Sequence, residues 1–517
     1  MDKFVSRIKS QITGVVSGFD RLVFRGTLIP LVRKRGMHHW LSRAGVRLLD
    51  FKDYALHISD RVKDAALAEA RDGGRPMLYL QHGSTNKEDL ARRLAKDHPI
   101  DEGLICTLST LETCMSFEYH RSPRPEERGL KLRPRKCLHI YKYFQHPLFG
   151  FMNARLQTWF PFSIQICLNG REWLGKLMDR KEIGYKRNDN CFTAIDNIRA
   201  AQRPMDKQLE SDWPNLLDNV ARTLNPLHGE IFGPWPMDYY WSAYQTEWAT
   251  DILFQDPRSL ASFYPQLVQH AMTHFKSPDV MRFLGKKAHG GFTGEIVTSF
   301  KDRAEGVRVK HWVAGNSIKM YDKAASVLRV ETTIAKPTPF KVFRPVDDAK
   351  PDGKHAWRPL RKGVADLHRR AEVSQRANET YLEALSAVDD ATPLSEVFDA
   401  VSHPTSMRGH RVRALRIGDS ADIALLEAIA RGEFATAGFR CRDLQRLLHP
   451  GRVGTADQRQ QIARHCGRQI RLLRAHGIAR KVPRTHRYVL TLKGHQLAAA
   501  LFAARHATTQ QILRNAA

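Results

Sequence analysis

Short runs of alternating or continuous apolar residues mark strands along the first 345 positions of the chain. The clearest runs are MLYL, LICTLSTLE, KCLHIYKYF, FSIQICL, YYWSAYQTEW, EIVTSF, RVKHWV, SIKMY and LRVETTI. Several of the segments between them show the 3.6-residue period of helices. The pattern therefore predicts an α+β or mixed α/β body over residues 1–345.

Three polar stretches interrupt this pattern and suggest how the chain is divided. Residues 121–134 are charged and contain prolines, residues 344–359 carry neither helix nor strand signals, and residues 402–410 separate two helical regions. The pattern between the last two stretches is helical. We therefore expect a body that is one domain or two divided near 121–134, a helical connector over 358–402, and a C-terminal domain over 408–517.

The order of elements in the C-terminal part predicts a winged helix-turn-helix. The helices SADIALLEAIARG and RCRDLQRLLH precede a glycine-containing turn and a longer helix, TADQRQQIARHCGRQIRLLRAHG. Two short strands, IARKV and RYVLTL, then flank the turn PRTH, and a last helix follows. This is the layout of the winged motif. The segment RLLRAHGIARKVPRTHRYVLTLKG resembles the end of a MarR-like winged helix.

The longer helix of this unit has one apolar and one basic face. Helical spacing places Ile462, Cys466, Ile470 and Leu473 together, and Arg464, Arg468 and Arg471 opposite them. Residues 401–517 contain 21 Lys or Arg and 6 Asp or Glu, an imbalance that favours binding to phosphates over an ordinary solvated face. We expect these three arginines to enter a DNA groove, while the wing holds phosphates through Arg480, Lys481, Arg484 and Arg487.

The composition of the whole chain also predicts an anionic partner. The formal net charge is +28 for 517 residues, of which 42% are hydrophobic, so nucleic acid is a better candidate than a membrane surface. No apolar run reaches the roughly 18 residues that span a bilayer, and the first residues lack a secretory signal. We expect a cytoplasmic protein of the bacterial nucleoid. The seven cysteines are scattered, which indicates reduced thiols.

The stretch IKMYDKAASVLRVETT (318–333) predicts a hairpin with a polar and an apolar face. A turn at residues 324–326 pairs residue 321 with 329 and residue 319 with 331. One face then carries Ile318, Met320, Leu328, Val330 and Ile334; the other carries Lys319, Tyr321, Lys323, Arg329, Glu331 and Thr333. A slip by one residue would put Arg329 and Glu331 on the aliphatic face, so the cost of burying two charges selects this register.

The preceding strand repeats the device, because Arg308, Lys310 and Trp312 alternate with valines that face the core. We expect a half-solvated sheet surface with cations, two aromatic rings and one carboxylate, and three interpretations fit it. Cross-strand pairs alone explain it as ordinary sheet structure. Stacking of bases on Tyr321 and Trp312, beside the cations Arg308, Lys310, Lys319 and Arg329, explains it as a non-catalytic nucleic-acid platform.

The third interpretation is catalytic. A tyrosine hydroxyl can attack a DNA phosphodiester and hold the broken end covalently, provided that a cation or metal stabilises the transition state and a base takes the proton. Here Tyr321 is the candidate nucleophile, Lys319 and Lys323 are expected to lower its pKa, and Glu331 is the candidate Mg²⁺ ligand. The carboxylates that could complete the metal site are Asp20, Glu247 and Asp251.

Two resemblances bear on this interpretation. The strand pair GNSIKMYDK and LRVE is similar to one in rolling-circle replication initiators of the plasmid and phage transfer-initiator class, which implies strand nicking through a tyrosine and a divalent metal. No histidine-hydrophobe-histidine triplet of the related nickases occurs. The chain as a whole resembles uncharacterised bacterial multi-copy proteins with a MarR-like C-terminus, on the stretches GFDRLVFRGTL, LQTWFPFSIQICLNGREWL and LLRAHGIARKVPRTHRY, which implies a mobile-element context.

Another motif gives weaker evidence of function. GREWLGKL (170–177) has the spacing of a phosphate-binding loop, but Leu177 stands where a Mg²⁺-binding hydroxyl is needed, so an Asn-Gly turn entering a helix is the better interpretation. The sequence thus favours a nucleic-acid-binding protein of a mobile element, a transposase-like or initiator enzyme that nicks and joins DNA. A non-enzymatic MarR-like regulator and an RNA-binding protein are the alternatives.

Overall fold

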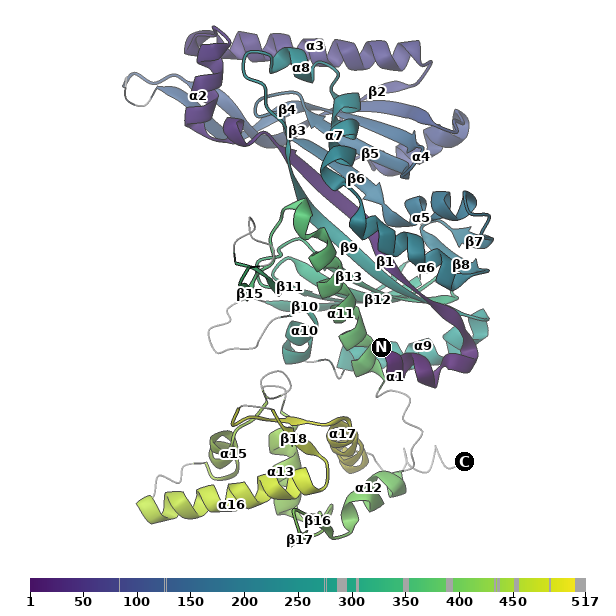
Figure 1. Ribbon diagram of the computed structural model, residues 1–517, viewed down its shortest axis with the longest axis vertical. Helices are drawn as coiled ribbons and strands as arrows, with labels where there is room; N and C mark the ends of the chain where they lie inside the picture. Colours follow the sequence, from purple (N-terminus) through teal and green to yellow (C-terminus); the bar gives the residue numbers. More distant parts are fainter. Residues whose placement is uncertain are drawn as a thin grey trace.

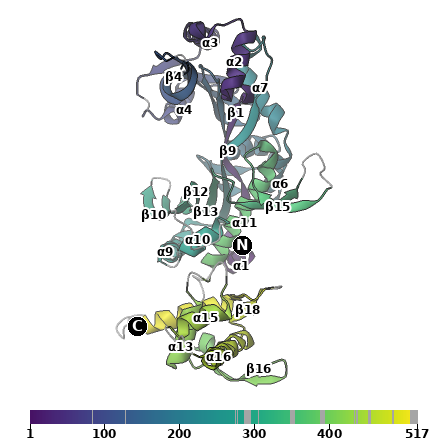
Figure 2. The same cartoon turned by 90° about the vertical axis from the view of Figure 1, so that its left-hand side faces the viewer.

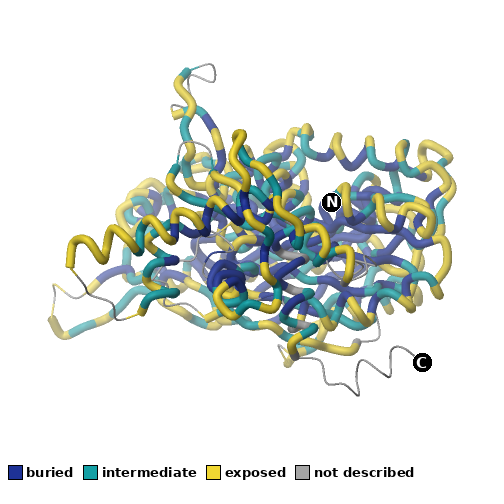
Figure 3. The backbone as a smooth tube through the Cα atoms, turned by 90° about the horizontal axis from the view of Figure 1, so that it is seen from below, coloured by how far each residue is buried: buried dark blue, intermediate teal, exposed yellow. Residues whose placement is uncertain are grey.

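The computed structural model describes an elongated molecule with a large sheet-containing body and a smaller helical unit at its C-terminal end (Figure 1). It describes the chain except for residues 83, 125, 127, 274, 276, 286–294, 304–305, 347–352, 387–393, 432–433, 435–437, 451–454, 483–484 and 507–517. The fold is of the α+β class, as predicted. Buried residues, dark blue in Figure 3, run through the middle of the molecule.

One mixed sheet of 11 strands forms the body, in the order β10-β11-β12-β13-β9-β1-β6-β5-β4-β3-β2. Only the edge pair β2–β3 is parallel among the described strands. Two long central strands, β1 and β9, join the upper and lower halves of the sheet (Figure 1). The strands are β1 (Ile12–Thr27), β2 (Met77–Leu80), β3 (Gly103–His120), β4 (Gly129–His146), β5 (Gly150–Gln157), β6 (Ile164–Asn169), β9 (Tyr240–Phe254), β10 (Ile296–Arg303), β11 (Gly306–Val313), β12 (Asn316–Lys323) and β13 (Val327–Ile334).

Helices cover one face of the sheet along most of its length. In the upper half their apolar sides pack with Phe24, Phe160 and Trp248 in one core cluster, and in the lower half they pack with Val309, Met320 and Leu328 in another. The helices of this layer are α1 (Asp2–Arg7), α2 (Lys34–Arg43), α3 (Phe51–Asp72), α7 (Trp213–Leu224), α8 (His228–Ile231), α9 (Pro257–Thr273), α10 (Ser277–Phe283) and α11 (Leu367–Leu385).

The opposite face is covered in two separate places. Helix α4 (Lys87–Asp97) packs on the upper half of the sheet, where its residue Ala91 lies in one cluster with Tyr143 of β4 and Phe151 of β5. Helices α5 (Gly170–Asp179) and α6 (Ile198–Lys207), with the hairpin β7 (Tyr185–Asn188) and β8 (Cys191–Ile195), pack near the centre against Val16 and Val327. The sheet face between these two covers carries the polar residues described below.

Several stretches differ from the sequence-based expectation. Residues 344–359, where we expected neither helix nor strand, contribute to the hairpin β14 (Lys341–Pro345) and β15 (His355–Pro359). Strand β4 begins at Gly129, inside the predicted loop 121–134, and pairs with β3, so both sides of that loop belong to one sheet. Helix α11, expected in a connector, packs on β9 and β13 through buried residues such as Asn378 and Tyr381, because most of its charges lie on its outer side. Arg370 is the buried exception among its described charged residues.

The C-terminal unit has its own core, formed by Val401, Leu426, Cys466, Leu473 and Leu497 with their neighbours. Its elements are α12 (Leu394–Ser402), β16 (Thr405–Met407), β17 (His410–Val412), α13 (Ser420–Ile429), α15 (Cys441–Leu448), α16 (Ala456–Ala475), β18 (Ala479–Lys481), β19 (Tyr488–Leu490) and α17 (Leu492–His506). None of the described helices of the chain combines the length and the apolarity that a membrane span needs.

A test of the fold is a close backbone approach at Gly170. A Cβ atom there would lie 2.0 Å from the carbonyl oxygen of Phe19, and backbone cannot move aside cheaply. Gly170→Ala should therefore destabilise the body by about 1–3 kcal/mol, measured as a lower urea midpoint of its tryptophan fluorescence. Gly229→Ala is the matched control, because a Cβ there meets nothing within 4 Å. Equal midpoints for the two variants would contradict the packing of α5 on β1.

Candidate functional site

The β12–β13 hairpin has the predicted register. Tyr321 pairs with Arg329 and Lys319 pairs with Glu331, while Ala324 and Ala325 take positive φ angles of 52° and 56° in the turn. The aliphatic side chains of both strands lie in the lower core cluster. The polar side chains therefore lie on the opposite face of the sheet, as expected.

This polar face is buried, which the sequence analysis did not predict. Tyr321 and Lys323 are 4% and 5% exposed, and Arg329 and Glu331 are 0% exposed. Side chains from the adjoining strand β9, from β1 and from the β7–β8 turn close over them. The expectation that Arg329 contacts nucleic acid is thus wrong, since its guanidinium is enclosed by protein partners.

Three carboxylates from three strands meet at this face. Asp20, Glu247 and Glu331 come from β1, β9 and β13, and each contributes an oxygen within 4.8 Å of the other two. Asp20 occupies a β-bulge, because Phe19 pairs with Trp248 while Arg21 pairs with Glu247, the next residue back along β9. Bulges re-aim side chains near functional sites. Here the bulge turns Asp20 toward the other two carboxylates.

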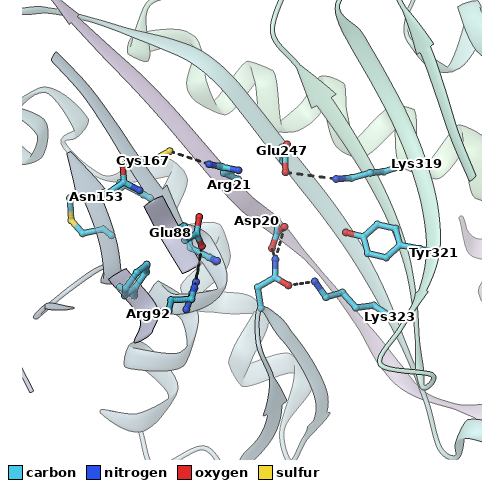
Figure 4. Close-up of a pocket in the computed structure, with 15 residues that line it drawn as sticks. Asp20, Arg21, Glu88, Arg92, Asn153, Cys167, Glu247, Lys319, Tyr321 and Lys323 are labelled. Atoms are coloured by element: carbon cyan, nitrogen blue, oxygen red, sulfur yellow. Dashed lines mark hydrogen bonds and ion pairs between the residues drawn. The ribbon is translucent and has the colours of Figure 1, made fainter. Parts of the chain in front are cut away.

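The candidate nucleophile is bonded directly to this cluster. The Tyr321 hydroxyl donates to Glu331 Oε2 at 2.8 Å. Lys319 Nζ lies 2.6 Å from the other oxygen of Glu331 and 3.9 Å from Glu247 Oε2. The ammonium groups of Lys319 and Lys323 stand 5.6 and 5.8 Å from the centroid of the Tyr321 ring (Figure 4). The structure thus brings together all three predicted catalytic residues.

Two buried arginines hold the carboxylates in place. Arg329 donates to both oxygens of Asp251, at 2.5 and 2.8 Å, and to Asp20 Oδ1 at 3.2 Å. Arg171, which is 0% exposed, lies 3.0 Å from Asp251 Oδ2. Asp251 is therefore engaged by two cations and does not join the metal-type cluster, whereas the other two carboxylate candidates do.

The β7–β8 turn completes the frame through Asn190. Its side-chain amide nitrogen donates to both oxygens of Asp20, at 3.1 and 3.0 Å, and its amide oxygen accepts from Lys323 Nζ. Asn190 thus links Asp20 to Lys323 at the end of β12.

The electrostatics of the cluster give its carboxylates very different pKa values. Burial opposes the ionisation of Glu331, but the charges of Lys319 and Arg329 outweigh it and lower its pKa to about 2. Burial and the negative charge of Glu331 raise the pKa of Glu247 to about 7. Burial also raises the pKa of Asp20, against the opposing effect of Arg329. At neutral pH Glu331 is therefore ionised, whereas Glu247 is protonated in about half of the molecules.

The pKa of Tyr321 is raised well above its ordinary value by burial and by the adjacent charge of Glu331. The expectation that Lys319 and Lys323 lower this pKa is wrong for the protein without a bound ion, because desolvation and Glu331 outweigh both ammonium groups. The hydroxyl is therefore protonated, and it donates to Glu331.

The donor set fits a hard divalent cation. All three carboxylates offer oxygen atoms, which Mg²⁺ prefers. Two of them have raised pKa values from mutual repulsion and burial, and a dication would relieve this repulsion. Asp20, Glu247 and Glu331 are thus the residues that would hold the ion.

A cleft gives access to the cluster between its two helical covers. Its volume is about 170 Å³, below the roughly 300 Å³ of typical small-molecule sites, so it suits a phosphate-sized group rather than a whole cofactor. Lys319, Tyr321 and Lys323 line one wall (Figure 4). Arg21 and Arg92 belong to the lining as well, with Arg92 stacked 4.2 Å over the ring of Phe151.

The other predicted binding residues lie farther out. Arg308 and Lys310 on β11 pair with Tyr321 and Lys319 and are partly exposed, and Trp312 is 46% exposed. On α16 the predicted apolar face is confirmed, because Cys466, Ile470 and Leu473 are buried and Ile462 packs against them. Arg464, Arg468, Arg471, Arg480 and Lys481 are exposed and Arg487 is half-buried, while Arg484 lies outside the described residues.

The sequence analysis missed Arg171 and Asn190. Arg171 stands in the motif that we rejected as a phosphate-binding loop. The alternative interpretation is confirmed, since the Asn169 side chain caps helix α5 by accepting from the backbone N–H groups of Arg171 and Glu172. The available signal for Arg171 was its helical spacing, which places it on the same face as the buried residues Leu174 and Met178. No local signal marks Asn190, because its partner Lys323 is 133 residues away.

No family model, curated protein or solved structure matches this chain. The geometry of the site therefore carries the functional argument.

The raised pKa of Glu247 predicts a pH dependence of stability. The folded protein holds a proton up to about pH 7, whereas the unfolded chain releases it near 4.5. Stability should therefore fall between these values, by about 1–3 kcal/mol. Urea unfolding in EDTA at about pH 5 and 8 measures this, and Glu247→Gln should remove most of the difference. An unchanged pH dependence in that variant would show that Glu247 titrates normally.

Proposed function

We propose that this protein is a metal-dependent DNA strand transferase that cleaves a phosphodiester through Tyr321 and can rejoin the ends. One observation carries the proposal: a buried tyrosine hydroxyl lies 2.8 Å from a carboxylate of an all-oxygen cluster, in a cleft lined by two lysines. Nucleophile, base, cation site and positive charge are the components that such chemistry needs.

In the proposed reaction the Tyr321 oxygen attacks phosphorus. The hydroxyl proton passes by way of Glu331 Oε2, its hydrogen-bond acceptor, to Glu247, whose pKa of about 7 allows it to keep the proton. A phosphotyrosyl ester forms as the bond from phosphorus to the deoxyribose oxygen breaks, and that oxygen leaves with a proton from a lysine of the cleft or from water. Attack of a DNA hydroxyl on the ester reverses the step, so no external energy source is required. A bound Mg²⁺ would stabilise the charge that develops on the phosphoryl oxygens.

The flanking lysines have a separate role. Lys319 keeps a raised pKa because Glu331 and Glu247 outweigh its desolvation, so it stays protonated. A fixed ammonium beside the cleft stabilises the pentacoordinate transition state more than the phosphodiester itself, because charge builds up during the attack.

The C-terminal unit supplies the binding to duplex DNA in this proposal. The order α13, α15, α16 and the pair β18–β19 supports a winged helix-turn-helix. The exposed arginines of α16 form the face that enters a groove, and the β18–β19 hairpin supplies cations for phosphates. A mobile-element role fits these activities and rests on the sequence resemblances alone.

The decisive experiment incubates the protein with Mg²⁺ and end-labelled DNA from its own genomic flanks, followed by a denaturing gel. We expect a covalent adduct that Tyr321→Phe abolishes and that EDTA prevents. Tyr141→Phe is the matched control, because Tyr141 is partly buried and also donates to a glutamate, Glu112, at 2.7 Å in the other half of the sheet. Asp20→Asn should lower the adduct yield at least about 100-fold.

Binding without any adduct would indicate a regulator in place of an enzyme. Selective copurification of RNA of defined sequence would favour the RNA-binding alternative. An adduct that persists in Tyr321→Phe would show that another residue is the nucleophile.

The duplex-binding role of α16 gives a second prediction. Replacing Arg464, Arg468 and Arg471 with alanine should weaken duplex affinity and lower the slope of log affinity against log salt by about 2–3, measured by fluorescence anisotropy. Lys52, Lys63 and Arg71, exposed cations of α3, form the control set. An equal loss for both sets would mean that net charge, and not the α16 face, drives binding.

A further inference from the structure

The β14–β15 hairpin is a two-stranded ribbon that projects from the body (Figure 2). One side faces the protein, where Val342 and Arg344 are 5% and 8% exposed. On the other side Phe343 and Trp357 are 57% and 62% exposed. Single exposed apolar residues are common, but adjacent ones that form a continuous patch often mark a binding site.

The two rings form a single surface. Phe343 pairs with Trp357 across the strands, and their centroids lie 5.7 Å apart. His355 stacks on Phe343 at 5.6 Å with an interplanar angle of 30°. The ribbon thus presents three adjacent rings held by a backbone ladder, so little conformational entropy is lost when a flat partner stacks on them.

The charge around these rings identifies the chemistry of the partner. Lys341 and Lys354 are exposed and Arg358 is partly exposed, and neither strand of the ribbon carries an acidic residue. An apolar protein surface would not need this cationic surround. Exposed rings among cations suit bases and their phosphates, and only unpaired bases offer free faces for stacking.

The base of the ribbon connects to the strand that carries the candidate site. The backbone N–H of Ala243 donates to the Lys362 carbonyl at 2.7 Å, and Ser242 forms a bridge with Gly363. Glu247 follows five residues after Ser242, which is about 17 Å along β9. Tyr240 and Tyr244, 53% and 47% exposed, lie on this stretch of β9. Val342 and Leu360 pack in the lower core cluster, so the ribbon lies on the helix-covered side of the sheet, and β9 connects it with the candidate site.

We propose that the β14–β15 ribbon is a stacking site for single-stranded DNA, in which Phe343 and Trp357 hold unpaired bases. The stacking of bases is inferred from the exposed rings of Phe343 and Trp357 alone. The choice of DNA over RNA rests on the proposed function.

The test measures binding of a labelled oligodeoxythymidine of about 20 nucleotides by anisotropy, in a Tyr321→Phe background so that cleavage plays no part. Joint replacement of Phe343 and Trp357 by alanine should weaken binding at least about fivefold. Trp357→Phe should retain most of the affinity and lose part of the tryptophan quenching by DNA. Tyr79→Ala is the control, because Tyr79 is 56% exposed on edge strand β2.

An abasic oligomer of the same length separates stacking from charge, since the alanine variants should bind it as well as the parent does. Unchanged affinity for oligodeoxythymidine in the double variant, or an equal loss on the abasic oligomer, would overturn the proposal. Tighter, ribbon-dependent binding of oligouridine would overturn the assignment to DNA. Loss of self-association without loss of DNA binding would identify the ribbon as a protein interface. Because none of these arms uses cleavage, they fail independently of the Tyr321 chemistry.

Discussion

The buried contact between Arg329 and the carboxylates of Asp251 and Asp20 is the interaction on which the candidate site depends. It ties β13 to β9 and β1, the strands that also carry Glu331 and Glu247. A buried charge that loses its partner costs about 3–5 kcal/mol, so these groups hold one another in a single arrangement. Arg171 adds a second fully buried cation beneath Asp251. The positions of the cluster are thus set by Arg329, Arg171 and Asp251, which take no part in the proposed chemistry.

This frame balances charge in the absence of substrate. Four carboxylates, Asp20, Glu247, Asp251 and Glu331, lie among four cations, Lys319, Lys323, Arg171 and Arg329. The balance explains how a polar face can be buried in the centre of a sheet. The two groups nearest the cleft can still change their charge, because Glu247 ionises near neutral pH and the Tyr321 hydroxyl keeps its proton. Entry of a dication and a phosphodiester would change the charge state of these outer groups and leave the inner arginine pairs intact.

The residues of the candidate site and the surfaces suited to binding a polymer lie in different parts of the molecule. The cleft accepts little more than a phosphate group, so affinity for a polymer has to come from elsewhere on the molecule. The basic C-terminal unit and the aromatic β14–β15 ribbon are two such surfaces, one suited to duplex grooves and the other to unpaired bases. In the proposed function these two surfaces and the cleft would engage DNA at a junction between double and single strand.

The sequence by itself determined the local periodic features: the register and two faces of the β12–β13 hairpin, the apolar and basic sides of α16, and the capped entry to α5. These follow from periods of 2 and 3.6 residues, which neighbouring positions express directly. Tertiary structure alone decided that Asp20 and Glu247 join Glu331 while Asp251 does not, that Asn190 reaches Lys323, and that the polar hairpin face is covered. It also made a paired ribbon of residues that carry no strand signal. The reason is physical: which face is buried depends on elements hundreds of residues away, and their packing leaves no trace in local periodicity.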